Sequence, residues 1–291
     1  MDTTDQDELK AKSEDEFLKL ALERFDRDVR ADQDNRVKML EDLKFEAGDQ
    51  WPEAVRADRE KDGRPCLTIP RTSQFKRQIT GDIRLNKPSI KVRPVDGQAD
   101  KKTAEILNGL IRNIEDQSRA GYVYSVGADC SVTCGIGAWR IVTEYSDDDG
   151  FEQDIRIKAI PNALSVVWDS NAVEPDKDDA SHCFVHYRMS KREVKARYPE
   201  ASLIDFAVTG DDPEATRAAD WYDTDSMRVA EYWVKKPYRK TIYKLSDGRT
   251  VDEKGLQEPE EAQLIQSGAV TVVSQREVDT YKVCQYILSG N

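Results

Sequence analysis

The spacing of the apolar residues changes around Gly135–Gly137, and this change constrains the fold more than any other feature of the sequence. Before it, apolar residues recur every three or four positions, as in amphipathic helices that bury one stripe. From Ala138 onward they alternate with polar residues, as in half-exposed strands. The order predicts an α+β fold, with N-terminal amphipathic helices followed by antiparallel β-hairpins and short helices.

The first helical stretch opens with a capping box formed by Ser13 and Glu16. Its apolar stripe consists of Leu18, Leu22, Phe25 and Val29. The polar residues 31–36 either break this helix or bridge solvent before a second helical face continues to Phe45. We expect residues 1–47 to form an N-terminal helical region and residues 48–291 to form an α+β domain.

The middle of the chain gives the clearest helical patterns. Residues 72–87 predict a helix with one buried stripe, formed by Phe75, Ile79 and Ile83. Residues 99–117 predict a helix with a wide apolar face, formed by Ile106, Leu107, Leu110, Ile111 and Ile114. Residues 122–134 predict a further helix. We expect a loop at 56–66 and, at 89–95, an edge strand, because apolar and basic residues alternate there.

The second half predicts antiparallel strands. A turn at Asp147–Gly150 predicts a β-hairpin over residues 138–160. Shorter elements follow: strands at 165–168, 182–189, 229–234 and 269–288, a hairpin at 241–251, a helix capped by Ser190 and Glu193, and a helix at 260–267. Residues 207–225 are expected to form a loop. Trp139 and Trp168 lie within the strand patterns, so we expect both to be largely buried and to pack the sheet against the 99–134 helices.

Composition narrows the class of protein. The chain has 44 Lys and Arg against 56 Asp and Glu, a net charge of -12, which disfavours a free-standing DNA-binding protein but allows a local basic patch. No run of 18 apolar residues predicts a membrane span, and the acidic N-terminus does not resemble a signal peptide. Five cysteines without framework spacing are typical of reduced, intracellular thiols.

Motifs for catalysis are missing from the sequence. It has no G-x-x-x-x-G-K-[ST] loop and no G-x-S-x-G elbow, and only two histidines. We therefore expect no catalytic residue, no metal site, no cofactor, and neither ATPase nor nuclease activity. An enzyme that uses its acidic clusters with magnesium remains an alternative hypothesis.

Two residue clusters could bind a metal in principle. Soft ligands for zinc are Cys130, Cys134, His182, Cys183 and His186, but two thiols on the apolar stripe of a helix are usually core residues. The acids Asp147, Asp148 and Asp149 could bind magnesium weakly, although such a turn is usually only solvated. A calcium loop starting at Asp169 is rejected, because Glu174 stands where the loop needs a glycine.

Basic side chains gather in one predicted helix–strand unit at residues 71–93. They are Arg71, Lys76, Arg77, Arg84, Lys87, Lys91 and Arg93. This basic unit could follow nucleic-acid phosphates or contact another subunit, while the simpler interpretation is a solvated face. A stand-alone DNA-binding module is therefore a second alternative. Acids that could meet the basic unit on a neighbouring subunit are Asp147, Asp148, Asp149, Asp176, Asp178 and Asp179.

Several segments of the chain resemble the N-terminal half of podovirus portal proteins of the P22 type. Order and spacing match from about residue 20 to the end, and the carrying segments are 48–51, 78–94, 103–115, 135–145, 167–171 and 176–183. The segment at 135–145 reads GIGAWRIVTEY, and the last two read VWDSN and DKDDASHC. None of these motifs is catalytic, so the resemblance rests on collinearity.

The resemblance implies a structural protein of the virion. Portals of this family form a dodecameric ring at one capsid vertex, through which double-stranded DNA is packaged and ejected. The implied partners are further copies of the chain, the terminase large subunit, head-to-tail adaptors and a scaffold or capsid protein, with no membrane. The implied location is the portal vertex, and the host bacterial cytoplasm during assembly.

The resemblance covers only the wing-type region of the family. The stem, clip, crown and C-terminal barrel would lie beyond Asn291, so the chain is expected to be a fragment or the product of a decayed prophage gene. Most of the ring-closing area would then be missing. We expect the 291-residue chain to be monomeric or to associate weakly in dilute solution.

Overall fold

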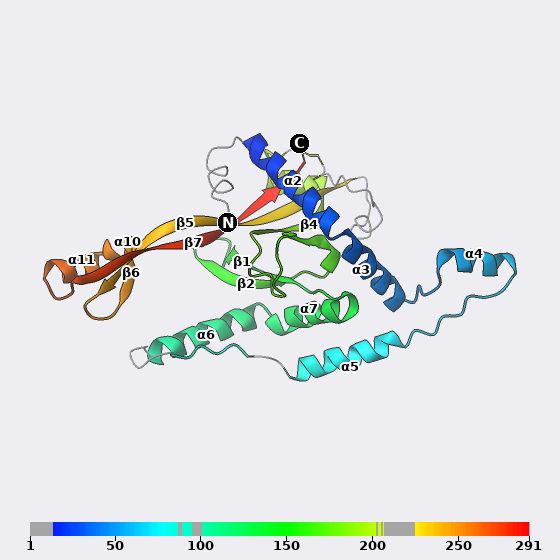
Figure 1. Ribbon diagram of the computed structural model, residues 1–291, viewed down its shortest axis with the longest axis horizontal. Coiled ribbons are helices and arrows are strands. Elements are labelled where there is room, and N and C mark those ends of the chain that lie inside the picture. Colours follow the sequence, from blue (N-terminus) through cyan, green and yellow to red (C-terminus); the bar gives the residue numbers. More distant parts are fainter. Residues whose placement is uncertain are drawn as a thin grey trace.

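The computed structural model describes residues 14–86, 89–94, 101–201, 203–204, 206 and 225–290. Helices dominate up to residue 134 and antiparallel strands dominate after it, which confirms the predicted α+β class. Figure 1 shows three tiers: helix α2 with the large sheet at the top, a β-hairpin below it, and helices α5, α6 and α7 at the bottom. None of the described helices has both the length and the apolarity that a membrane crossing requires.

Two helices form the N-terminal region, α2 (Glu14–Ala31) and α3 (Gln33–Glu46), and the predicted interruption at 31–36 is a one-residue break. The stripe of α2 packs on the large sheet, where Phe25 is fully buried and meets Phe184 edge to face, with ring centroids 5.2 Å apart. Because its core partners lie far along the chain, α2 is tied to the sheet rather than standing as a separate unit.

The large sheet has five antiparallel strands. They are β3 (Val166–Trp168), β4 (His182–Ser190), β5 (Ser226–Leu245), β6 (Thr250–Asp252) and β7 (Val272–Leu288), in the order β3-β4-β5-β6 with β7 also paired to β5. Strand β5 is longer than the predicted 229–234, because its second half continues as a two-stranded ribbon with β7. Most of the predicted 207–225 loop lies outside the described residues.

The second sheet is the predicted hairpin, β1 (Trp139–Tyr145) paired with β2 (Gln153–Ala159). It lies on α6 (Lys101–Gln117) and α7 (Ala120–Cys134), where Val123 and Ile157 share a small core. An ion pair from Arg140 to the buried Glu231 of β5 ties this hairpin to the large sheet.

The prediction that Trp139 is largely buried is wrong. Its ring packs against Gly127 and Tyr124 of α7, but 47% of its surface is exposed. Trp168 is half-buried, and it packs within the large sheet beside Val166 and Trp233 rather than against the 99–134 helices.

Two predictions for residues 48–95 are also wrong. The expected loop at 56–66 begins as a helix, α4 (Glu53–Lys61), and the expected strand at 89–95 is not a strand in its described part, 89–94. There the side chain of Asn108 on α6 bonds both the N–H of Val92, at 2.8 Å, and its carbonyl oxygen, at 2.9 Å. An amide side chain thus takes the place of a partner strand.

Helix α5 (Thr72–Leu85) forms as predicted, but its apolar stripe is not buried. Phe75, Ile79 and Ile83 are 64%, 50% and 41% exposed. Helix α5 runs along the outside of α7, at the bottom of Figure 1, and no other described element covers its outer face. The apolar face of α6 is similarly open at Ile106, Leu107 and Leu110.

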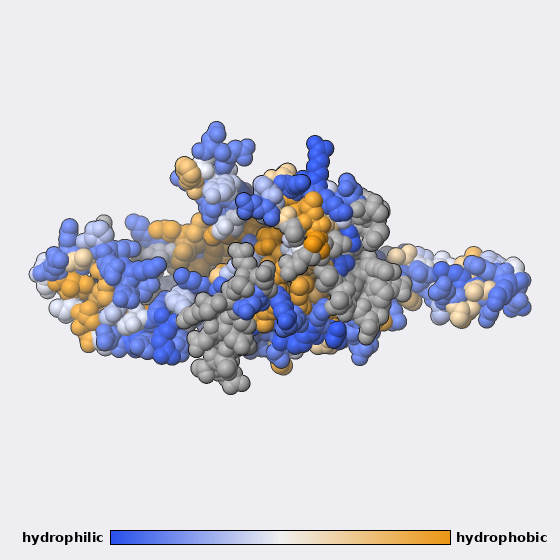
Figure 2. Space-filling model, turned by 90° about the horizontal axis from the view of Figure 1, so that it is seen from above, coloured by the Kyte–Doolittle hydropathy of each residue, from blue (hydrophilic) through white to orange (hydrophobic). Residues whose placement is uncertain are grey.

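The remaining helices are short. Helix α8 (Lys191–Arg197) follows the predicted cap, since the Ser190 hydroxyl accepts a bond from the Glu193 N–H at 3.1 Å. Helices α10 (Glu253–Leu256) and α11 (Pro259–Gln266) lie with β6 at the far end of the β5–β7 ribbon. Seen from above, hydrophobic residues gather over the central body and at the end of this ribbon (Figure 2).

Candidate functional site

A buried polar cluster lies where α2 meets the large sheet. The Nε2 atom of His182, the first residue of β4, is 2.8 Å from Oδ2 of Asp28 on α2. Both side chains are almost completely buried, so the contact is shielded from water. The hydrogen bond joins two segments 154 residues apart in the chain.

Asp169 and Ser181 complete the cluster on the other side of the imidazole. The Ser181 hydroxyl lies 2.8 Å from Nδ1 of His182 and 2.5 Å from Oδ2 of Asp169. Asp169 directly follows β3 and Ser181 directly precedes β4, so the antiparallel pairing of these strands sets their positions. The cluster therefore connects α2, β3 and β4.

Hydrogen bonds keep both carboxylates ionised in spite of their burial. Burial alone would raise the pKa of Asp28, but bonds from His182, Ser170 and Arg27 outweigh it and lower the pKa to about 2. The pKa of Asp169 is also lowered, because bonds from Ser181 and the Asn171 N–H outweigh burial. The half-exposed Arg27 guanidinium lies 3.0 Å from Asp28 and 3.6 Å from Asp169.

The cluster is a hydrogen-bonded network that links α2 to the ends of β3 and β4. Asp28, Asp169 and His182 could each offer a ligand atom, all within 4.8 Å, which is the spacing of a metal site. However, Asp28 accepts bonds from the N–H and hydroxyl of Ser170, at 3.2 and 2.8 Å, and Arg27 already supplies a positive charge. With its oxygens bonded by protein donors, the cluster forms a complete network as it stands.

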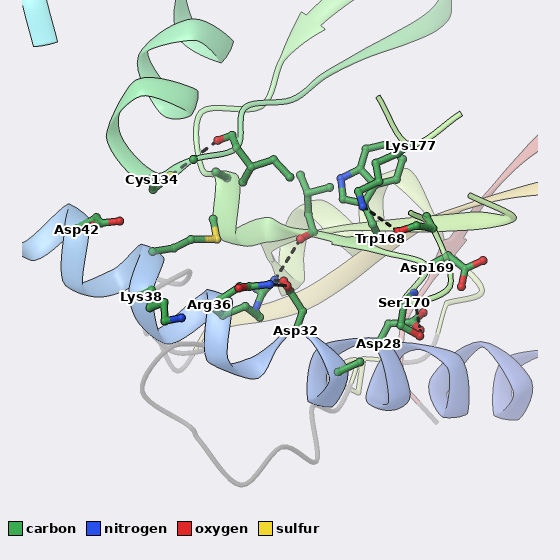
Figure 3. A pocket seen from close by; sticks show the side chains of 18 residues that line it. Asp28, Asp32, Arg36, Lys38, Asp42, Cys134, Trp168, Asp169, Ser170 and Lys177 are labelled. Carbon is green, nitrogen blue, oxygen red and sulfur yellow. Dashed lines mark hydrogen bonds and ion pairs between the residues drawn. The ribbon is translucent and has the colours of Figure 1, made fainter. Parts of the chain in front are cut away.

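A cavity of about 510 Å³ opens beside the cluster, between the α2–α3 break and the loop after β3 (Figure 3). Arg36, only 2% exposed, donates to the carbonyl oxygens of Leu164 and, at 3.2 Å, Val166. The rim carries both signs of charge, from Asp32, Asp42, Lys38 and Lys177. Because the rim carries both charges, it does not favour a ligand of either charge. The hydrogen bonds of Arg36 join α3 to β3.

The five potential zinc ligands do not form one site. Cys130 and Cys134 pack in an apolar cluster with Leu164 of the short 3-10 turn before β3, and burial raises the pKa of both thiols. His182 belongs to the polar cluster above. Cys183 points to the opposite face of β4, and burial raises its pKa to about 12.

His186 lies deep in the core, ring to ring with Phe25 at 5.9 Å. Burial, aided by the charges of Arg228 and Arg36, lowers its pKa to about 3, so the imidazole is neutral. Both histidines of this chain therefore have structural positions.

The acidic turns are held by their own backbone. The Asp147 carboxylate accepts the Asp149 N–H at 3.1 Å, and the Asp176 carboxylate accepts the Asp178 N–H at 3.2 Å. The Asp179 carboxylate accepts two N–H bonds, which lower its pKa. These acids, including Asp148, are exposed, so their structural role in the turns leaves them available for surface contacts.

Some side chains of the basic unit at 71–93 already form ion pairs within the protein. Lys76 pairs with Glu46 at 3.6 Å and Arg84 with Asp129 at 3.1 Å, so both join α5 to neighbouring helices. Arg71, Arg77, Lys91 and Arg93 are exposed, whereas Lys87 lies outside the described residues.

Sequence reasoning missed Asp28 and the Arg36 contact. The available signal was an acid next to the buried stripe of α2, one residue before Val29, where an unpaired carboxylate would be costly. Its partners could not be identified, because they come from the strands around residues 169–182.

Two comparisons with known proteins agree with each other. The family model described as phage P22-like portal protein matches residues 22–291. A curated portal protein of Acyrthosiphon pisum secondary endosymbiont phage 1 is 31% identical over 226 residues. The match covers 74% of this chain and 31% of that relative, so the chain matches less than a third of the relative's length.

Proposed function

Because this chain belongs to the phage P22-like portal protein family, we propose that it forms part of a portal ring at the unique capsid vertex. In this role it contributes to the conduit through which double-stranded DNA enters and leaves the capsid. It also helps to form the platform for the terminase large subunit and the head-to-tail adaptors. The observation that carries the proposal is the family match over residues 22–291.

The open apolar faces support assembly with further protein. Ile79 on α5 and Ile106 and Leu110 on α6 are each at least half exposed, although they lie on regular amphipathic helices. An apolar groove of about 610 Å³ lies between these helices and the hairpin, lined by Ile83, Ile111, Tyr124, Trp139 and other residues. Surface of this kind usually marks an interaction site.

Ring contacts in this proposal are heterologous, so one patch of each subunit meets a different patch of the next. Of the basic unit, Arg77, Lys91 and Arg93 are exposed and could face acids of a neighbour. Those acids would come from the two exposed turns, Asp147–Asp149 and Asp176–Asp179. Exposed ion pairs contribute only about 0–1 kcal/mol each, so such pairing would set register more than affinity.

We propose a structural role with no turnover by this chain. The polar cluster around Asp28 fastens α2 to the sheet and has its oxygens bonded by protein donors. The protein would act in the virion at the portal vertex and assemble in the host bacterial cytoplasm, where a scaffold or capsid protein would be a further partner.

Cryo-electron microscopy of virions that carry a tagged version of this protein tests the proposal. The label is expected at one vertex only, in a ring of symmetry-related copies. A label spread over the capsid faces, or its absence from purified virions that still carry DNA, would contradict a portal role. Loss of DNA-filled capsids when the gene is deleted would support it.

A further inference from the structure

The two faces of the β5–β7 ribbon carry different charges. In the part that we call the arm, Lys236–Lys244 of β5 pairs with Ser274–Lys282 of β7. Paired residues point to the same side of an antiparallel ladder, and successive residues alternate sides. One face, here the basic face, therefore carries Lys236, Lys240, Lys244, Arg276 and Lys282, with Tyr238 and Ile242 between them.

The opposite face, here the paired face, carries one cation and two acids, which pair with one another. Arg239 lies directly across from Asp279, with Nε to Oδ1 at 2.8 Å, and also reaches Glu277 at 3.3 Å. Each acid of the arm is therefore next to a cation on this second face. The β5–β7 pairing places no acid on the basic face between Lys236 and Lys244.

Side-chain contacts confirm which residues share a face. The Lys282 ammonium stands 5.1 Å from the ring centroid of Tyr238, and that of Lys236 stands 4.8 Å from Tyr286, both on the basic face. The paired face turns toward the β1 hairpin, because Val283 and Lys235 line one cavity together with Trp139 and Ile141. The basic face turns to the α2 side, where Phe17 packs on Tyr286.

Strand β6 adds one acid to the basic face near its end. Asp252 pairs with Ile242, but its carboxylate caps α10 by accepting the Gly255 N–H at 2.9 Å. Among the described residues, no carboxylate lies within ion-pair distance of Lys240, Lys244 or Arg276. The net result is a basic strip on a projecting arm (Figure 1) of a protein whose net charge is -12.

We propose that the basic face of the arm binds the phosphate backbone of double-stranded DNA. Lysines four residues apart on a strand are about 13 Å apart, so the strip presents positive charge along its length. A two-stranded ribbon also has the width that the major groove of duplex DNA admits. Tyr238 and Ile242 add contact area between the cations.

The acidic charge of the rest of the chain restricts DNA contact to the arm. An acidic body is repelled by DNA, so attraction is confined to the arm and the duplex meets the protein in one orientation. The inference rests on the proposed function, because it names the surface of a portal subunit that meets the DNA. Binding is measured on the protein alone, so a failure of ring assembly or vertex location leaves this result unaffected.

Fluorescence anisotropy with a labelled 20-base-pair duplex tests the inference across a salt series. The arm variant combines Lys240→Gln, Lys244→Gln and Arg276→Gln, three exposed or half-exposed positions. Each phosphate contact contributes roughly 0.9 to the slope of log affinity against log salt. The arm variant should lower that slope by roughly 2 to 3 and weaken binding by at least about tenfold, with unchanged thermal melting.

A matched control removes the same charge elsewhere. It combines Arg77→Gln, Lys91→Gln and Arg93→Gln, three exposed positions of the basic unit, and should bind the duplex like the unmodified chain. Loss of binding in this control but not in the arm variant would overturn the inference and assign DNA contact to the basic unit. No binding by the unmodified chain in 50 mM salt would also overturn it. An arm variant that still binds the duplex but has lost self-association would overturn it as well.

Discussion

At the scale of single residues, the account depends most on Asp28. This carboxylate lies buried between α2 and the large sheet, hydrogen-bonded to His182 at the start of β4 and to Ser170 just after β3. A helix whose stripe needs only apolar contacts could slide or rotate on the sheet. The directional bonds of Asp28 fix one position, which explains why an acid lies beside a buried stripe.

We predict that Asp28→Asn lowers the free energy of unfolding by roughly 3–5 kcal/mol, because it breaks the buried pair of Asp28 and His182. The pH dependence should change as well. In the folded protein the pKa of Asp28 is about 2, below its ordinary 3.8, so its stabilising effect is complete above 3.8 and is lost as pH falls through about 2. Urea unfolding at pH 7 and between pH 2 and 4 measures both effects.

Glu23→Gln is the control for this variant, because Glu23 is an exposed acid on the same helix. It should change the free energy of unfolding by less than about 0.5 kcal/mol. Equal effects of the two substitutions would show that Asp28 does not fasten α2 to the sheet.

Trp139→Ala should cost roughly 2 kcal/mol, less than the 3–5 kcal/mol of a fully buried aromatic residue. The reason is that about half of the side chain remains exposed above Gly127 and Tyr124. Chemical denaturation of the variant checks this value. A loss above about 4 kcal/mol would show that Trp139 is covered by protein in solution.

At the scale of elements, periodicity predicted most helices and strands but not their surroundings. The stripe of α5 was correctly placed on a helix, yet its burial was wrong because periodicity marks an apolar face without identifying what covers it. The strand predicted at 89–95 was wrong because Asn108, on α6, supplies the hydrogen bonds that alternation alone would assign to a strand. The same limit hid the cluster around Asp28.

The junction between α7 and β1 gives a prediction at this scale. A Cβ atom added at Gly137 would lie 1.9 Å from the backbone oxygen of Gly127, so the strand and the helix would have to separate. Gly137→Ala should therefore lower the free energy of unfolding by at least about 3 kcal/mol. Thermal unfolding followed by circular dichroism measures the loss.

Gly109→Ala is the matched control, since it makes the same change in the middle of α6 with open space around the new Cβ atom. It should stabilise the protein by about 0.5–1 kcal/mol, because alanine favours helix more than glycine does. If both variants behaved alike, the close approach of β1 to α7 would not exist in solution.

At the scale of the whole molecule, the structure leaves apolar faces on α5 and α6 open, and a basic strip on a projecting arm. Collinearity with portal proteins could be read from the sequence, because it depends on the order and spacing of motifs. The positions of the open faces could not be, since they depend on which helices pack together. A subunit that completes its core only within an assembly explains the open apolar faces on α5 and α6.

Native mass spectrometry tests the central claim, that this chain is a portal subunit, most directly. Two proteins are compared: the 291-residue chain, and the same chain joined to the C-terminal part of the related endosymbiont-phage portal protein. We predict a monomer or weak oligomer for the first and a closed dodecameric ring for the second. Ile79→Glu with Leu110→Glu should prevent the ring. A longer chain that stays monomeric would contradict this claim, whereas a stable salt-resistant ring from residues 1–291 alone would show that these residues close the ring by themselves.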